Sequence, residues 1–234
     1  MAKKDFASVD DALNAAKSDN KIMPLMFLMD CSSSMGGSKI QAVNSFFDKL
    51  STKLEEKLKD FVGVDFKVAV MQFNDNVDWI TGRSMLSSSD LASCQLQASG
   101  CTAVGKALTE LNSKLNKSSD GYLIQSGNSK YYTPAIIILS DGQPTDDWKK
   151  GLEKLEKNVY FMASRKRGSV RAVAVGDDAD KDMLAKITGN IEFVVEATNA
   201  EDIIDALDVV TMTATMSAQA NPGAGSGDSD DPTC

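Results

Sequence analysis

The residues best suited to chemistry in this chain follow a strongly apolar segment. Asp30, Ser32 and Ser34 stand at alternate positions directly after residues 22–29. Alternate residues of an extended loop can converge their oxygen atoms, and a helix that begins near Ser38 adds free backbone N–H groups at its start. One carboxylate and two hydroxyls form a set of hard oxygen ligands, which suits Mg²⁺, Mn²⁺ or Ca²⁺.

Two residues far along the chain extend this set. Asp141 follows the apolar residues 135–140, in the same relative place as Asp30 on another strand, and Thr102 begins a helical pattern. If the two strands are neighbours, the two carboxylates repel each other, and a divalent cation would remove that repulsion. One position of a six-coordinate shell would stay open for a partner. The predicted metal ligands are Asp30, Ser32, Ser34, Thr102 and Asp141.

Each of these residues alone has a plainer interpretation. Asp30 with its serines could form an N-cap and a turn, Asp141 with Gly142 could form only a turn, and Thr102 could cap a helix. The joint pattern favours a metal site, because the residues occur in the right order and on the expected loops.

The absence of histidine excludes several kinds of catalytic and metal site. The chain has none, which removes Ser-His-Asp and Cys-His nucleophile activation and the commonest nitrogen ligand of zinc, copper and nickel. The four cysteines show no Cys-x-x-Cys spacing, so neither a zinc site nor a dithiol redox site is predicted. A disulfide between Cys94 and Cys101 stays open as a minor alternative.

Composition and charge exclude several classes of partner. The 234 residues are 42% hydrophobic and 25% charged, as in ordinary globular proteins, and the net charge is −8. This charge disfavours binding of nucleic acid or of anionic membranes by bulk electrostatics. The apolar runs are too short to span a bilayer, and the first residues do not resemble a secretory signal. We therefore expect a cytoplasmic protein with neither nucleic acid nor membrane as a partner.

The hydrophobic pattern predicts alternating strands and helices. Strands are predicted over residues 22–29, 65–73, 77–80, 135–140, 170–175 and 191–195. Helices are predicted over residues 38–59, 102–116, 147–165 with a break near Asn158 left open, 180–188 and 201–216. The continuous apolar strands indicate burial on both faces, and residues 77–80 form a hairpin with the strand before them. The charged residues of helix 38–59 are assigned to a solvated face, and residues 81–100 to a loop.

These elements predict a doubly wound α/β fold, Rossmann-like, with a mostly parallel sheet, one short antiparallel edge strand and helices on both faces. In such sheets the ligand site lies beyond the carboxyl ends of the strands, where the strand order switches. The expected organisation is an N-terminal extension with a helix (1–21), one domain (22–216) and a disordered acidic tail rich in Gly, Ser and Asp (217–234).

The five candidate ligands resemble the metal-ion-dependent adhesion site of von Willebrand factor A domains. The resemblance covers residues 22–216. Three local phrases, at residues 100–105, 140–146 and 176–180, are most similar to the bacterial TerY-type branch, which is associated with tellurite-resistance gene clusters. Cys101 stands where that branch is expected to have glycine.

The resemblance implies a role for each residue. Ser32 and Ser34 would bind the metal directly, Thr102 directly or through water, and Asp30 and Asp141 mainly through waters. A carboxylate from a partner protein would take the open position. The family is not enzymatic, and the TerY-type resemblance implies a cytoplasmic stress-response or signalling assembly, alongside a kinase and a phosphatase.

Two other functions stay open. In a phosphatase similar to haloacid dehalogenases, Asp30 would be the nucleophile and residues 176–180 the acidic Mg²⁺ loop, but Ser32 stands where that family has an acidic residue. A structural domain with a vestigial site is the plainer alternative. The acidic residues 177–182 could form a second cation site, although we favour a helix N-cap with solvated charge.

Overall fold

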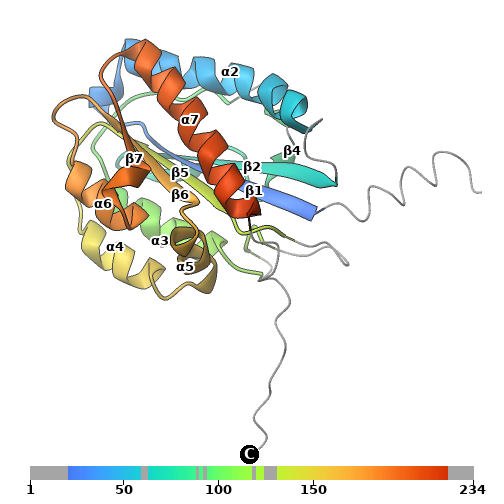
Figure 1. The fold of residues 1–234 in the computed structure, drawn as a ribbon. Coiled ribbons are helices and arrows are strands. Elements are labelled where there is room, and N and C mark those ends of the chain that lie inside the picture. Colours follow the sequence, from blue (N-terminus) through green and yellow to red (C-terminus); the bar gives the residue numbers. More distant parts are fainter. Residues whose placement is uncertain are drawn as a thin grey trace, which may run out of the picture.

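The computed structural model describes residues 21–58, 63–87, 90–91, 94–117, 120–123 and 131–220, and all structural statements refer to these. The helix predicted within the first twenty residues and all but the first residues of the predicted tail lie outside them. Figure 1 shows the arrangement, in which a central sheet lies between two layers of helices.

The sheet is mostly parallel, as predicted. Its order is β3-β2-β1-β5-β6-β7, and β4 also pairs with β2. The parallel strands are β1 (Lys21–Asp30), β2 (Val64–Phe73), β5 (Ala135–Ser140), β6 (Val170–Val175) and β7 (Val194–Ala197). The antiparallel partners of β2 are β3 (Val77–Trp79) and β4 (Leu86–Ser87). The two-residue β4 lies within residues 81–100, which the sequence predicts as a loop. The strand was not predicted because two residues are too few to show an alternating pattern.

Two layers of helices bury both faces of the sheet. The helices α2 (Ser38–Leu58) and α7 (Ala200–Gln219) cover one face. The helices α3 (Val104–Lys114), α4 (Trp148–Leu155), α5 (Val159–Lys166) and α6 (Lys181–Thr188) cover the other (Figure 1). Two short 3₁₀ turns, η1 (Ser33–Met35) and η3 (Ile191–Phe193), complete the described elements. Because Phe27 belongs to the core beneath α2 and Leu28 to the core on the opposite face, β1 must be apolar throughout.

Two helices differ from their predicted extents, one because of a cap and one because of burial. Asn158 accepts hydrogen bonds from the backbone N–H groups of Tyr160 and Phe161, so the helix predicted over 147–165 is two helices. At the other end of the chain, α7 continues to Gln219 because Ala218 is still buried against the core. None of the helices in the described ranges combines the length and apolarity needed to cross a membrane.

The strand order switches between β1 and β5. The chain passes from β1 to β2 on one side of β1 and then crosses to β5 on the other side. The parallel register pairs Met29 with Leu139, so Asp30 and Ser140 end neighbouring strands at the same edge of the sheet. The loops that carry the predicted ligands therefore meet at the switch point.

Candidate metal centre

Asp30 is a fully buried carboxylate that the chain holds at both oxygens. Its Oδ1 accepts a hydrogen bond from the backbone N–H of Ser32 at 2.9 Å, and its Oδ2 accepts one from the Ser140 hydroxyl at 2.6 Å. Burial raises the pKa of Asp30 above its ordinary value of 3.8, the hydrogen bonds from Ser140 and Ser32 lower it, and the charge of Asp141 raises it further. Asp30 is thus fixed in orientation and sensitive to nearby cations.

Two hydroxyls converge on Asp141. The Oγ atoms of Ser32 and Ser34 lie 3.0 Å apart, and Ser34 Oγ donates a hydrogen bond to Asp141 Oδ1 at 2.7 Å. Ser32 Oγ donates a longer one to the same oxygen at 3.5 Å. The 3₁₀ turn η1 positions the serines, because the backbone N–H of Met35 donates to Ser32 O while the Met35 side chain is buried in the core. Two loops far apart in sequence thereby form one oxygen cluster.

Thr102 places a third hydroxyl beside this cluster. A Cβ atom on Gly142 would lie 3.2 Å from Thr102 Oγ1 and 3.9 Å from Ser34 Oγ, so glycine permits this close approach. Thr102 is only 5% exposed, and its carbonyl accepts a hydrogen bond from the backbone N–H of Thr145. The N-cap of α3 is Ala103, with no side-chain cap, so the alternative that Thr102 caps this helix is wrong.

Asp146 supports the site, although the sequence reasoning assigned it no role. Its Oδ1 and Oδ2 accept hydrogen bonds from the backbone N–H groups of Gly105 (2.8 Å) and Lys106 (2.9 Å) at the start of α3. The first turn of α3 contains no acidic residue of its own. A carboxylate from a distant loop thus binds the positive end of the helix and joins the Asp141 loop to Thr102. The pattern within either segment alone does not reveal this pairing.

The sequence reasoning also missed Lys39 and Ser140. Lys39, in the first turn of α2, forms an ion pair with Asp141, with 2.6 Å between Nζ and Oδ2. Its side chain is 32% exposed, whereas that of Asp141 is fully buried. The sequence pattern predicts Lys39 on a solvated face with the other charged residues of this helix, and for Lys39 the ion pair shows this prediction to be wrong. Ser140 could have been found from its position, because it ends a buried strand directly before Asp141.

The donor set is made of hydroxyls and two carboxylates. Among the described residues, no group of three or more carboxylate, thiol or imidazole side chains is placed to hold a metal. Burial, and then the charge of Asp30, raises the pKa of the neighbouring Cys31 to about 12, so this thiol stays protonated at neutral pH. Cys94 and Cys101 are free, and the disulfide left open above is wrong. Hard oxygen atoms remain as the donors.

A protein-family model described as von Willebrand factor type A domain matches residues 25–208, which is most of the chain. The chain belongs to this family. Its predicted fold and its resemblance to the family are confirmed, whereas the TerY-type branch stays a prediction. A comparison with curated protein sequences finds no match.

Solved structures of several other proteins share the fold. The domain matches the pilus adhesin SpaC from Lactobacillus rhamnosus GG with a TM-score of 0.59 and 14% identity, over 83% of this chain and 31% of that chain. It matches the von Willebrand factor domain of the type V pili tip protein Mfa5 from Porphyromonas gingivalis with a TM-score of 0.58 and 10% identity, over 87% and 98%.

A third match is the mussel byssus proximal thread matrix protein 1, whose structure is described as having a zinc-occupied MIDAS motif. The TM-score is 0.53 and the identity 19%, over 84% of this chain and 46% of that chain. The chain thus spans less than half the length of SpaC and of the byssus protein.

The acidic loop of the domain contains a helix cap. Asp180 is the N-cap of α6 and accepts a hydrogen bond from the backbone N–H of Met183 at 2.8 Å. Asp177 and Asp178 are exposed. The interpretation of this loop as an N-cap with solvated charge is therefore confirmed for these residues.

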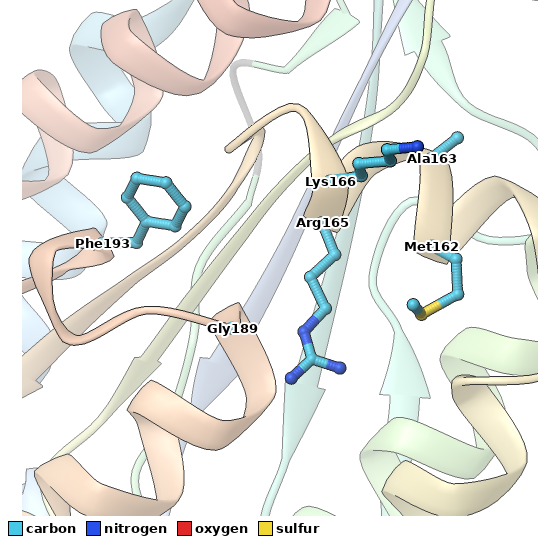
Figure 2. Close-up of a pocket in the computed structure, with 6 residues that line it drawn as sticks. All are labelled: Met162, Ala163, Arg165, Lys166, Gly189 and Phe193. Atoms are coloured by element: carbon cyan, nitrogen blue, oxygen red, sulfur yellow. The ribbon is translucent and has the colours of Figure 1, made fainter.

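A pocket of about 450 Å³ lies elsewhere on the domain. It is lined by Met162, Ala163, Arg165, Lys166, Gly189 and Phe193. Figure 2 shows the Arg165 side chain running past Gly189, and its guanidinium binds Glu156 and the carbonyl of Lys186. Because α5 and α6 end here before entering β6 and η3, the pocket is at the amino ends of the strands. It is therefore separate from the oxygen cluster at their carboxyl ends.

Proposed function

We propose that this von Willebrand factor A domain is a metal-ion-dependent protein-interaction module. A divalent cation would be held by Ser32, Ser34 and Thr102 with Asp30 and Asp141, and an acidic side chain of a partner protein would complete its coordination. The observation that carries the proposal is the convergence of the Ser32 and Ser34 hydroxyls on Asp141 Oδ1 at the switch point of the sheet.

The donor chemistry fits a hard cation. Three hydroxyls and two carboxylates present only oxygen atoms, which favours Mg²⁺ and also suits Mn²⁺ or Ca²⁺. The byssus protein of the same fold has a zinc-occupied site, which supports divalent binding without identifying the ion here. In this domain Ser32 and Ser34 would be direct ligands. Asp30 and Asp141, whose oxygens already accept hydrogen bonds from the chain, would act mainly through waters.

A bound ion would supply a positive charge with an open coordination position at the edge of the sheet. The residues of the chain hold and orient this position. Ser140 and the Ser32 backbone fix Asp30, and Asp146 keeps the Asp141 loop against α3. A partner's aspartate or glutamate fits the site by charge. The net charge of −8 supports our proposal that neither nucleic acid nor membrane is the partner.

The rival function as a phosphatase has less support. A nucleophilic Asp30 would need a free carboxylate oxygen facing substrate, but this residue is fully buried and both its oxygens have partners. Ser32 is a hydroxyl where that mechanism uses an acid. Phosphate release from a generic phosphomonoester with Mg²⁺, abolished in Asp30→Asn, would restore this alternative.

Thermal melting tests the proposed site. The EDTA-treated protein is melted with and without excess Mg²⁺, for wild type, for Asp141→Ala and for the exposed control Asp205→Ala on α7. Metal at 100 times its Kd adds about 2.7 kcal/mol to the free energy of unfolding. We expect this shift in wild type and in the control and its loss in Asp141→Ala. No shift in any of them, with acetate present in place of a partner's carboxylate, would indicate a vestigial site.

We also propose the finer assignment to a cytoplasmic, bacterial TerY-type assembly that responds to stress or tellurite, with a kinase or phosphatase as partner. The three short sequence segments at residues 100–105, 140–146 and 176–180 support it. Affinity capture in Mg²⁺ and in EDTA tests this assignment, with Ser34→Ala as the control. A kinase or phosphatase retained only by wild type, and only in Mg²⁺, is the expected result.

A further inference from the structure

Lys39 forms an ion pair with Asp141, whose carboxylate the proposed cation site also uses. Its Nζ lies 2.6 Å from Asp141 Oδ2, while Ser34 holds the other oxygen of the same carboxylate. The Asp141 side chain is fully buried. This is a short, charge-assisted contact to a buried group, unlike the exposed ion pairs expected on the outer face of a helix.

The Lys39 side chain can adopt a position away from Asp141. It is 32% exposed, so its ammonium can turn into solvent and be hydrated there when another cation pairs with the buried Asp141. On the other side, a Cβ atom on Gly176 would lie 4.0 Å from Lys39 Nζ, and the exposed Asp177 and Asp178 follow directly. The ammonium thus lies close both to Asp141 and to Gly176, where the acidic loop begins.

Lys39 and a divalent cation cannot both be bound strongly here. With both carboxylates ionised, Asp30, Asp141 and Lys39 leave one excess negative charge. A divalent ion among the hydroxyls would turn this into an excess positive charge, with two cations a few ångströms apart in a partly buried site. Like charges at that separation repel each other, and the burial of the Asp141 carboxylate between them limits the screening by water.

We propose that Lys39 and the divalent cation compete for Asp141. Lys39 neutralises the carboxylate when the ion concentration is low, and the ion displaces the ammonium toward the acidic loop when it binds. This inference rests on the proposed metal site. Its consequence is that Lys39 weakens the affinity for the cation, and so sets the ion concentration at which the domain becomes able to bind an acidic partner.

Calorimetric titration of the EDTA-treated protein with Mn²⁺ tests this. Lys39→Met removes the ammonium and keeps an unbranched side chain one atom shorter, whereas Lys39→Arg keeps the charge. Lys49→Met is the matched control, because this exposed lysine lies ten residues further along α2, about 15 Å along the helix axis. We expect Lys39→Met to bind Mn²⁺ about tenfold more tightly than wild type, a difference of about 1.4 kcal/mol. Lys39→Arg and the control should stay within about twofold, well below that difference.

Melting in EDTA gives a second readout. Lys39→Met should melt below wild type in EDTA, because Asp141 loses its counter-ion, and the difference should shrink or reverse in Mn²⁺. If Lys39→Met does not fold in EDTA, Lys39→Gln keeps a hydrogen-bond donor without the charge and gives the same titration. An unchanged or weaker Mn²⁺ affinity in the charge-removing variant overturns the competition, while binding by wild type leaves the metal site in place. Failure of both proteins to bind would overturn the metal site and the competition together.

Discussion

The Ser140 hydroxyl donates a hydrogen bond to Asp30 Oδ2 at 2.6 Å, which joins the carboxyl ends of two neighbouring strands. Ser140 and Asp30 come from β5 and β1, and both are buried. The contact orients Asp30 on one oxygen while the Ser32 backbone orients the other. The base of the candidate metal centre is therefore part of the sheet rather than of a flexible loop.

Ser140→Ala should destabilise the protein at neutral pH. It leaves one oxygen of a buried carboxylate without its partner, which costs about 1–3 kcal/mol. Urea unfolding in EDTA at pH 7 measures the change, with the exposed Ser113→Ala on α3 as the control. Because protonation of Asp30 removes the unpaired charge, the cost should shrink as the pH falls. An equal cost at every pH would show that Ser140 contributes by packing alone.

Asp30→Asn should stabilise the protein in EDTA while abolishing metal binding. Since burial raises the pKa of folded Asp30 above 3.8, the folded chain binds more protons than the unfolded chain in the window between those two pKa values. Stability therefore falls as the pH rises through this window, and the ionised carboxylate remains destabilising above it. Asparagine removes that charge, and its amide can still pair with Ser32 and Ser140.

Urea unfolding between pH 4 and pH 8 measures this difference. The gain in Asp30→Asn should be present at pH 7 and should decrease toward pH 4, whereas the exposed control Asp205→Asn should show no such trend. A variant that is less stable than wild type at pH 7 in EDTA would contradict the role assigned to burial.

Asp146→Ala should weaken metal binding without removing a ligand. The change removes the carboxylate that joins the Asp141 loop to the start of α3, and the loss of such a cap costs about 1 kcal/mol. Asp147→Ala is the matched control, because Asp147 caps α4 through Lys150 N. Both variants should lose similar stability in urea, but only Asp146→Ala should lower the Mn²⁺ affinity. Equal affinity in the two variants would show that the loop keeps its place without Asp146.

The cysteines should differ in reactivity. In a Cys234→Ser background, a disulfide reagent at pH 8 should modify the exposed Cys101 in the folded protein and spare the buried Cys31 and Cys94. The pKa of Cys31 of about 12 and its burial both protect it. Asp75 raises the pKa of the Cys101 thiol through a hydrogen bond and its charge, so Asp75→Asn should speed the reaction. Modification of Cys31 without unfolding would contradict its position beneath the site.

Much of the fold could be predicted from the sequence because its signals are local. The run that forms β1 has to be apolar on both sides, and strands that alternate with helices indicate a parallel sheet. The position of the switch between β1 and β5 comes from the structure. Asn158 shows the limit, because a single capping side chain decides whether one helix or two form. The two-residue strand β4 shows another, since only its pairing with β2 defines it.

Part of the candidate site could also be predicted, because some of its residues form local sequence patterns. Asp30, Ser32 and Ser34 form a pattern within five residues, and Asp141 ends a recognisable strand. The supporting contacts are tertiary, because Asp146 binds another helix and Lys39 reaches across to Asp141. Neither spacing nor residue type distinguishes Lys39 from the solvated lysines of the same helix.

The most direct test of the central claim is a titration of the EDTA-treated protein with Mn²⁺, followed by the electron paramagnetic resonance signal of the free ion. Acetate is included in place of a partner's carboxylate, and wild type is compared with the Ser32→Ala/Ser34→Ala double variant. The proposed metal centre predicts saturable binding of one ion per chain by wild type and none by the variant, because two direct ligands are lost. Equal binding by both proteins, or no saturable binding by wild type, would contradict it.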